Sequence, residues 1–280
     1  MELISQHKCF NGVQVFYKIE STSTGLPMTF SVYQPPQAKH KKVPVLFYLA
    51  GLTCTEETFM IKGGAQRYAA EHGIMLVSCD TSPRRTGIKG AGDSWDFGHG
   101  AGFYIDATQQ PWATHFRMES FVVQELRSLI INEFPALADR IGVFGHSMGG
   151  HGALTLALRH PDIFKSVSAF APITAPSHCP WGQKAFSAYL GSDHSQWAQH
   201  DASALMRERK TPFPDGILID QGLDDQFLET ELLPHHFESA CWKAEQPLTL
   251  RRHAGYDHNY YFISTFMEDH IVFHSKLLNK

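Results

Sequence analysis

A serine between glycines follows an apolar run in the stretch VFGHSMGGHGAL, residues 143–154. Within it, residues 145–149 read G-H-S-M-G, preceded by the strand-like RIGVFG and followed by the helix-like GALTLALRH. Strand, tight turn and helix are the context in which G-x-S-x-G forms a nucleophile elbow, which exposes the serine hydroxyl for attack on a carbonyl carbon. We therefore predict that Ser147 is a nucleophile rather than a surface serine on a glycine-rich turn.

A serine hydroxyl is a weak nucleophile and needs a base, which a third group must orient. Where this elbow occurs, the chain order is serine, then aspartate or glutamate, then histidine, so both partners should follow residue 147. Asp224 and Asp225 come directly after the strand-like GILIDQG, and open α/β sheets place their sites at the carboxyl ends of strands. This reasoning does not decide which of the two aspartates orients the base. His258, in the loop between LTLRRH and the last helical stretch, is the candidate base.

The other histidines and the cysteines do not suggest a metal site. The chain has 17 histidines, and His270 and His274 lie four apart in the last helical stretch, as packing or surface groups would. No H-E-x-x-H spacing occurs, and the five cysteines are scattered without a C-x-x-C pair. We predict neither a metal site nor a disulfide framework.

Acyl transfer also needs donors for the oxyanion that develops on the carbonyl oxygen. One is the backbone N–H of the residue after the nucleophile, here Met148, and the other comes from the loop after an early strand. That loop is LAGLTCTEETF, which makes the Leu52 N–H the expected second donor.

The elements that would position these residues alternate between strand and helix. Amphipathic stripes predict helices around residues 122–130 and 263–271. Residues 12–20 and 28–36 alternate more and predict antiparallel strands at one edge. Five nearly continuous apolar runs predict buried parallel strands, at residues 43–51, 74–80, 140–146, 166–172 and 216–222. We expect an α/β fold with a mostly parallel central sheet, helices on both faces, and one domain over residues 1–280.

Charge and hydropathy exclude several classes of partner. The 280 residues carry a formal charge of −4, so no basic face for nucleic acid is predicted. No apolar run approaches the roughly 20 residues that span a bilayer, and the opening MELISQHKCFNG lacks the features of a signal peptide. These features predict a soluble cytoplasmic protein that binds neither nucleic acid nor membranes.

Longer stretches of the chain extend the serine motif, among them AGLTCTEETF, CDTSPR, GAGDSWDFGHGAGFYIDATQQPW, CPWGQKAFSAYLG, LIDQGLDDQFL and GYDHNYYFISTFMEDHI. From about Phe10 to the last helix, the sequence resembles the S-formylglutathione hydrolase (esterase D) family. The resemblance implies an α/β-hydrolase fold, no cofactor and a homodimer. It also implies hydrolysis of a small-molecule substrate, S-formylglutathione, to formate and glutathione in cytosolic formaldehyde detoxification.

The resemblance also assigns roles to individual residues. It implies that Ser147 is the nucleophile, that His258 is the base, and that Asp225, two residues before the phenylalanine of D-x-F-L, is the acid. Asp224 then becomes a neighbour. A family cysteine beside the oxyanion loop matches Cys54, and the resemblance implies that thiol modification there modulates activity.

Four further positions concern the substrate mouth. Arg85 and Glu119 depart from the family, which commonly has a glycine and an aromatic residue there, so these departures bear on the surface and the mouth. Trp181 and Lys184, in CPWGQK, are candidates for the mouth itself, although a tryptophan near proline and glycine is as often a packed loop anchor.

Three alternatives stay open. A general short-chain carboxylesterase would use the same triad and differ only in leaving group and acyl size. A non-catalytic binding protein of the hydrolase fold conflicts with the complete set of candidate residues. A cysteine hydrolase using Cys54 lacks an evident base close to it in the sequence.

Overall fold

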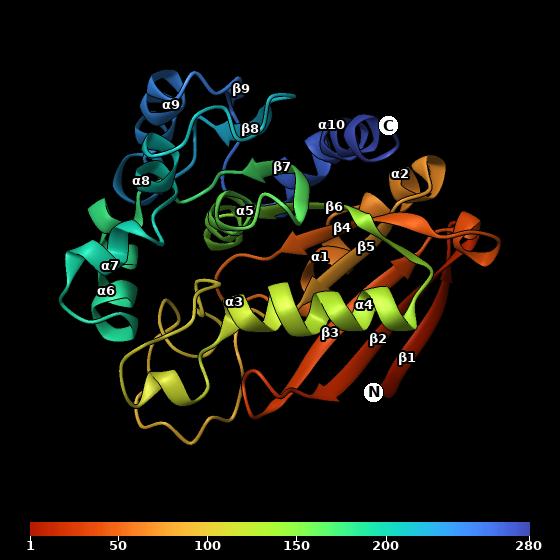
Figure 1. Cartoon of the computed structure of the whole chain (residues 1–280), viewed down its shortest axis with the longest axis horizontal. Coiled ribbons are helices and arrows are strands. Elements are labelled where there is room, and N and C mark those ends of the chain that lie inside the picture. Colours follow the sequence, from red (N-terminus) through yellow and green to blue (C-terminus); the bar gives the residue numbers. More distant parts are fainter.

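One sheet of nine strands runs through the structure (Figure 1), a computed structural model that describes residues 1–280. The strand order is β1-β2-β3-β5-β4-β6-β7-β8-β9. The strands are β1 (Glu2–Cys9), β2 (Gly12–Glu20), β3 (Pro27–Gln34), β4 (Val43–Leu49), β5 (Met75–Cys79), β6 (Ala136–His146), β7 (Phe164–Phe170), β8 (Ile217–Gly222) and β9 (Leu248–His253).

The strands β5, β4, β6, β7, β8 and β9 pair in parallel, whereas β1, β2, β3 and β5 pair antiparallel. The predicted mostly parallel sheet with antiparallel strands at its N-terminal edge is therefore confirmed. Every residue of β4 and β5 is buried, as their continuous apolar runs require. Strand β1 was not predicted, because none of its residues is buried and its sequence has no apolar alternation.

Helices cover both faces of this sheet (Figure 1). Helices α1, α2 and α10 pack on one face, and α4 and α5 pack on the other. None of the helices is both long and apolar enough to cross a membrane. The helices are α1 (Glu56–Lys62), α2 (Ala65–His72), α3 (Met118–Ser120), α4 (Arg127–Glu133), α5 (Met148–Arg159), α6 (Pro180–Tyr189), α7 (His194–Ala198), α8 (Ala202–Arg207), α9 (Pro234–Lys243) and α10 (Tyr260–Leu278).

Both predicted amphipathic stripes lie in helices. The first spans a π-helical segment, η3 (Phe121–Leu126), and the start of α4, which together continue α3. The second lies in α10, whose Ile263, Met267 and Ile271 are fully buried. The remaining short helical segments are η1 (Pro36–Lys39), η2 (Trp112–Thr114), η4 (Pro176–His178) and η5 (Leu228–Leu232).

The two histidines of α10 are core residues rather than surface groups. Both are fully buried, and Ser168 Oγ on β7 lies 2.8 Å from His270 Nδ1 and 2.8 Å from His274 Nε2. Ser166 Oγ lies 2.6 Å from the other ring nitrogen of His274. A chain of hydrogen bonds therefore joins α10 to β7 inside the apolar core, where each polar atom needs a partner.

Asp220 on β8 continues this chain of hydrogen bonds toward β9. Its carboxylate accepts from Arg251 Nε at 2.6 Å, and the Nε2 atoms of His253 and His270 lie 3.1 and 3.2 Å from it. Burial opposes ionisation of this carboxyl, but the hydrogen bonds from His270, Arg251 and His253 hold the pKa of Asp220 well below its ordinary value. The ionised Asp220 thus ties β8 to β9 and α10, just before the loop that carries Asp224 and Asp225.

Several histidines, His274 among them, are buried in the neutral form. Burial lowers the pKa of His151 to about 4 and that of His200 to about 4. It also holds the pKa of His146 and of His274 well below 6.5. In an unfolded chain, these groups would take up protons as the pH falls below about 6.5.

We therefore predict that the free energy of unfolding decreases as the pH falls from 6.5 to 5. In this window, the unfolded chain binds more protons than the folded protein. Each such histidine therefore lowers the free energy of unfolding by on the order of 1 kcal/mol per pH unit. Urea unfolding at several pH values measures this slope. His151→Gln, whose amide can still donate to the His200 carbonyl, should flatten it. A slope that is equal in both proteins would contradict the prediction.

Candidate active site

Ser147 forms the turn between β6 and α5, as the sequence predicts. Its backbone has φ 57° and ψ −120°, a conformation that residues with a side chain rarely adopt. The Ser147 N–H donates to the Phe170 carbonyl at the end of β7 at 3.0 Å, and the Ser147 carbonyl accepts from Ile173 at 3.2 Å. The neighbouring strand therefore holds the strained backbone in place, as functional turns require.

The two glycines of the motif are required by close backbone contacts. A Cβ atom on Gly145 would lie 2.2 Å from the Gly149 carbonyl oxygen. A Cβ atom on Gly149 would lie 2.0 Å from the carbonyl oxygen of Leu49, the last residue of β4. Only glycine allows the first turn of α5 to approach β4 this closely.

Asp225 is the aspartate that contacts the candidate base. Its fully buried side chain has Oδ2 2.5 Å from His258 Nδ1, and its Oδ1 accepts from the Phe227 N–H at 2.9 Å. The amide of Gln221 lies 3.4 Å from Oδ2. With a proton on Nδ1, the neutral His258 ring presents Nε2 as an acceptor, which is the form that a general base needs.

Asp224, the other candidate, is exposed. Its Oδ1 accepts from the Gly255 N–H at 3.2 Å and does not contact His258. The structure therefore distinguishes the positions of the two consecutive aspartates, which the residue order alone leaves open.

Ser147 and His258 line the same cavity, whose volume is about 190 Å³. The His258 ring packs against Phe227 and against His146, with ring centroids 5.0 and 4.4 Å away. Burial, and then the proximity of His258, hold the pKa of His146 well below its ordinary value, so His146 adds no charge beside the base. The residues that line this cavity are Gly51, Leu52, Cys54, Trp95, His146, Ser147, Trp181, Phe227, His258, Asn259 and Tyr260.

Two backbone N–H groups are free to stabilise an oxyanion in this cavity. Leu52 lies in the loop after β4, and its N–H donates to no protein atom. Met148 is the first residue of α5, so its N–H has no acceptor one turn earlier in the helix. The loop is anchored by hydrogen bonds from Tyr104 Oη to the Ala50 carbonyl at 3.0 Å and from Thr53 N–H to Gly100 at 2.9 Å.

Cys54 also lines the cavity, but its thiol is not activated. Burial raises its pKa above the ordinary value, an effect only partly offset by a hydrogen bond with Thr58 and the charge of Lys62. A thiol in this environment is protonated at neutral pH, whereas a catalytic cysteine needs a lowered pKa. The geometry therefore favours the serine over a cysteine mechanism.

The two proposed mouth residues differ in position. Trp181 is 7 % exposed and lines the cavity, with Trp95 and Phe227 packed against its ring. It is therefore both a packed anchor and part of the cavity wall. Lys184 does not line the cavity, because its ammonium pairs with Asp96 at 2.5 Å.

Neither departure from the family lies in the cavity wall. Arg85 is exposed and has φ 55°, in the left-handed region where glycine is favoured. Glu119 is buried, and it pairs with Arg159 at 2.9 Å and His160 at 2.8 Å at the C-terminal end of α5.

Sequence reasoning missed several cavity residues. His146 directly precedes Ser147, and Tyr260 follows His258 by two residues, so proximity in the chain to these predicted site residues was the available signal. Trp95 and Phe227 come from loops, and only the fold shows that they approach the site.

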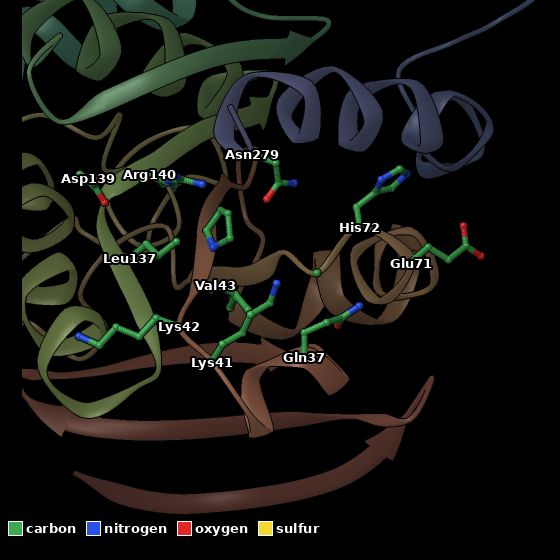
Figure 2. A pocket seen from close by; sticks show the side chains of 12 residues that line it. Gln37, Lys41, Lys42, Val43, Glu71, His72, Leu137, Asp139, Arg140 and Asn279 are labelled. Atoms are coloured by element: carbon green, nitrogen blue, oxygen red, sulfur yellow. The ribbon is translucent and has the colours of Figure 1, made fainter.

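Another hollow, of about 400 Å³, lies beside the amino ends of the central strands β4 and β6 (Figure 2). Figure 2 shows Lys41 and Gln37 on one side of it and Arg140 and Asn279 on the other. Its walls include the amino end of β4, whereas Ser147 follows the carboxyl end of β6, so this hollow is not part of the site. No group of three or more histidine, cysteine, aspartate or glutamate residues is placed to hold a metal ion.

The chain is similar to known proteins over its whole length. The Esterase family model matches residues 21–273. S-formylglutathione hydrolase from Rattus norvegicus is 52% identical over 282 residues, covering 100% of both chains. The enzyme of that name from Arabidopsis thaliana is 53% identical, over 98% of this chain and 97% of its own. The structure of an S-formylglutathione hydrolase from Agrobacterium tumefaciens has a TM-score of 0.96 and 48% identity, covering 99% of this chain and 100% of its own.

We predict that Gly149→Ala abolishes most esterase activity and lowers stability by about 1–3 kcal/mol, because the added Cβ overpacks the Leu49 carbonyl. Gly92→Ala is the matched control, since a Cβ there would meet only His99, at 3.5 Å. Hydrolysis of a chromogenic ester and thermal unfolding of both variants measure the difference. Full activity in Gly149→Ala would show that the close approach does not hold the turn.

Proposed function

Because the chain belongs to the S-formylglutathione hydrolase family of esterases, we propose that it hydrolyses S-formylglutathione to formate and glutathione in formaldehyde detoxification. Ser147, His258 and Asp225 would form its catalytic triad. The observation that supports this most directly is the 2.5 Å contact of Asp225 with His258 in a cavity that also contains Ser147.

In this mechanism, Ser147 Oγ attacks the formyl carbon while His258 Nε2 accepts the hydroxyl proton. Asp225 keeps the other ring nitrogen protonated and stabilises the imidazolium that forms. The N–H groups of Leu52 and Met148 donate to the oxyanion of the tetrahedral intermediate. Collapse of that intermediate breaks the carbon–sulfur bond, His258 gives its proton to the departing glutathione sulfur, and a formyl ester remains on Ser147. Water, deprotonated by His258, then attacks the ester, and formate is released as His258 returns the proton to Ser147 Oγ.

The substrate's chemistry suits this arrangement. A thiol leaving group has an ordinary pKa near 8.5, so its expulsion demands less proton donation than expulsion of an alkoxide. The formyl carbon carries only hydrogen, so the acyl group fits a cavity of about 190 Å³ beside the two donors. A larger acyl group would compete for this space with the walls formed by Trp181 and Phe227.

A general short-chain carboxylesterase is the second candidate. Six of the eleven residues that line the cavity are hydrophobic, which would also suit a simple apolar ester. The two functions share the triad and differ in acyl size and in contacts with the leaving group. A non-catalytic binding protein would have no need for a strained Ser147 beside a buried Asp225–His258 pair.

Three further parts of the proposal rest on the family resemblance and the continuous sheet. We propose a single domain over residues 1–280, a homodimer and a cytoplasmic location. Light scattering of the purified protein tests the dimer, and fractionation of cells tests the location.

We predict that Asp225→Asn lowers kcat by about 10⁴, because the amide would select the wrong tautomer of His258. Asp224→Asn, one residue away and exposed, should retain activity within a few fold. Steady-state kinetics on S-formylglutathione, with circular dichroism to verify folding, compares the two. The opposite ranking would assign the orienting role to Asp224.

We also predict that kcat/KM falls steeply from formyl to acetyl to butyryl thioesters of glutathione. A displacement of about 1 Å from the Leu52 and Met148 donors can cost roughly 10²-fold in rate. S-formylglutathione should also exceed simple formate esters, because remote contacts with glutathione can lower the barrier. A flat dependence on acyl length, without an advantage for the glutathione thioester, would favour the general carboxylesterase.

A further inference from the structure

A second hollow adjoins the active-site cavity. Its volume is about 400 Å³, and it shares Asn259 and Tyr260 with the cavity that contains Ser147. Its other walls are formed by Lys62, Tyr261 and Ser264. The hollow therefore begins at two residues that a substrate bound at Ser147 would also meet.

Lys62 supplies the positive charge of this hollow. It is the last residue of α1, its side chain is exposed, and it forms no ion pair. Its Nζ lies 5.9 Å from the centroid of the Tyr260 ring, within the range of a cation–π contact. The ring that forms part of the cavity wall thus also holds the Lys62 ammonium beside it.

No other lysine or arginine lines either cavity. Two other cations, one on α6 and one in the segment after β5, are already paired. Lys184 binds Asp96 at 2.5 Å, and Arg84 binds Asp80 at 2.7 Å. Lys62 is therefore the cation available to an anionic group of a bound substrate.

A different hollow, which His258 itself lines, has the opposite charge. Its volume is about 330 Å³, and it is lined by Asp224 and Asp257, together with Gln226 and three residues that also line the active-site cavity. Neither aspartate forms an ion pair, and both accept hydrogen bonds only from nearby backbone or amide groups. The two hollows therefore attract different charges.

The leaving group proposed above has a matching asymmetry. Glutathione carries its sulfur on the middle residue of three. Its glycine end has a carboxylate alone, whereas its γ-glutamyl end has a carboxylate and an ammonium on the same carbon. With the sulfur beside His258, the two ends extend in different directions. The glycine carboxylate is attracted by a lysine and repelled by aspartates. The ammonium of the γ-glutamyl end is attracted by aspartates and repelled by a lysine.

We propose that Lys62 binds the glycine carboxylate of the glutathione moiety, in the hollow formed with Asn259, Tyr260, Tyr261 and Ser264. This inference rests on the proposed function. The contact exists in the bound substrate as well as in the transition state, so it contributes to KM rather than to kcat. It also distinguishes the glutathione thioester from simple esters, which have no carboxylate to place there.

The test compares Lys62→Met with Lys62→Arg and with Lys41→Met. Lys41→Met removes a cation from the unrelated hollow at the amino ends of β4 and β6 (Figure 2). Each protein is assayed on S-formylglutathione, on the same thioester with glycinamide in place of glycine, and on a simple formate ester.

We expect Lys62→Met to raise KM for S-formylglutathione about fivefold to tenfold, with kcat unchanged. Lys62→Arg should restore most of the loss, and Lys41→Met should match the wild type. The glycinamide substrate should show the raised KM with the wild type and no further change with Lys62→Met. The formate ester should not distinguish the variants.

An unchanged KM for S-formylglutathione in Lys62→Met would overturn the proposal. So would an equal loss on the glycinamide substrate, because the lysine would then act without the carboxylate. The wild-type data separate these outcomes from failure of the proposed function. If the wild-type enzyme does not prefer S-formylglutathione to the ester, both the proposed function and the role of Lys62 are refuted. If the preference exists and survives Lys62→Met, only the role of Lys62 is refuted.

Discussion

The close approach of α5 to the end of β4 is the constraint on which the site depends. At Gly149, even a single Cβ atom would lie 2.0 Å from the Leu49 carbonyl oxygen, so the helix can begin only where a glycine stands. This contact fixes the sharp turn at Ser147 and gives it a backbone with φ 57°. It also brings the free N–H of Met148 to the same end of the sheet as the loop that carries Leu52. The proposed nucleophile and the proposed oxyanion donors therefore share one geometric cause.

The other half of the site depends on the end of β8. Asp220 ties this strand to β9 and α10 through Arg251, His253 and His270, all inside or at the edge of the core. The loops that follow β8 and β9 bring Asp225 and His258 together at 2.5 Å. The carboxylate of Asp225, proposed to orient the base, thus lies on a loop that leaves a strand fixed by buried hydrogen bonds. This explains how two loop residues can hold a distance that acid–base chemistry requires.

Much of the fold could be predicted from the sequence, because buried parallel strands such as β4 and β5 must be continuously apolar. Strand β1 could not, since an exposed edge strand carries no such signal. The elbow at Ser147 was predictable because its glycines are a local requirement. The choice between Asp224 and Asp225 depends on the turn after β8, which buries one side chain and exposes the other, so residue order alone could not make it. Lys184 illustrates the same limit, because its partner Asp96 lies 88 residues earlier in the chain.

The serine mechanism is tested by measuring hydrolysis of S-formylglutathione by the wild-type protein and by Ser147→Ala, with the secondary structure and Tm of both recorded. We predict that the wild type releases glutathione and that Ser147→Ala remains folded while kcat falls by on the order of 10⁶. A folded Ser147→Ala with near-normal turnover would contradict it, as would a wild-type protein that leaves the thioester intact.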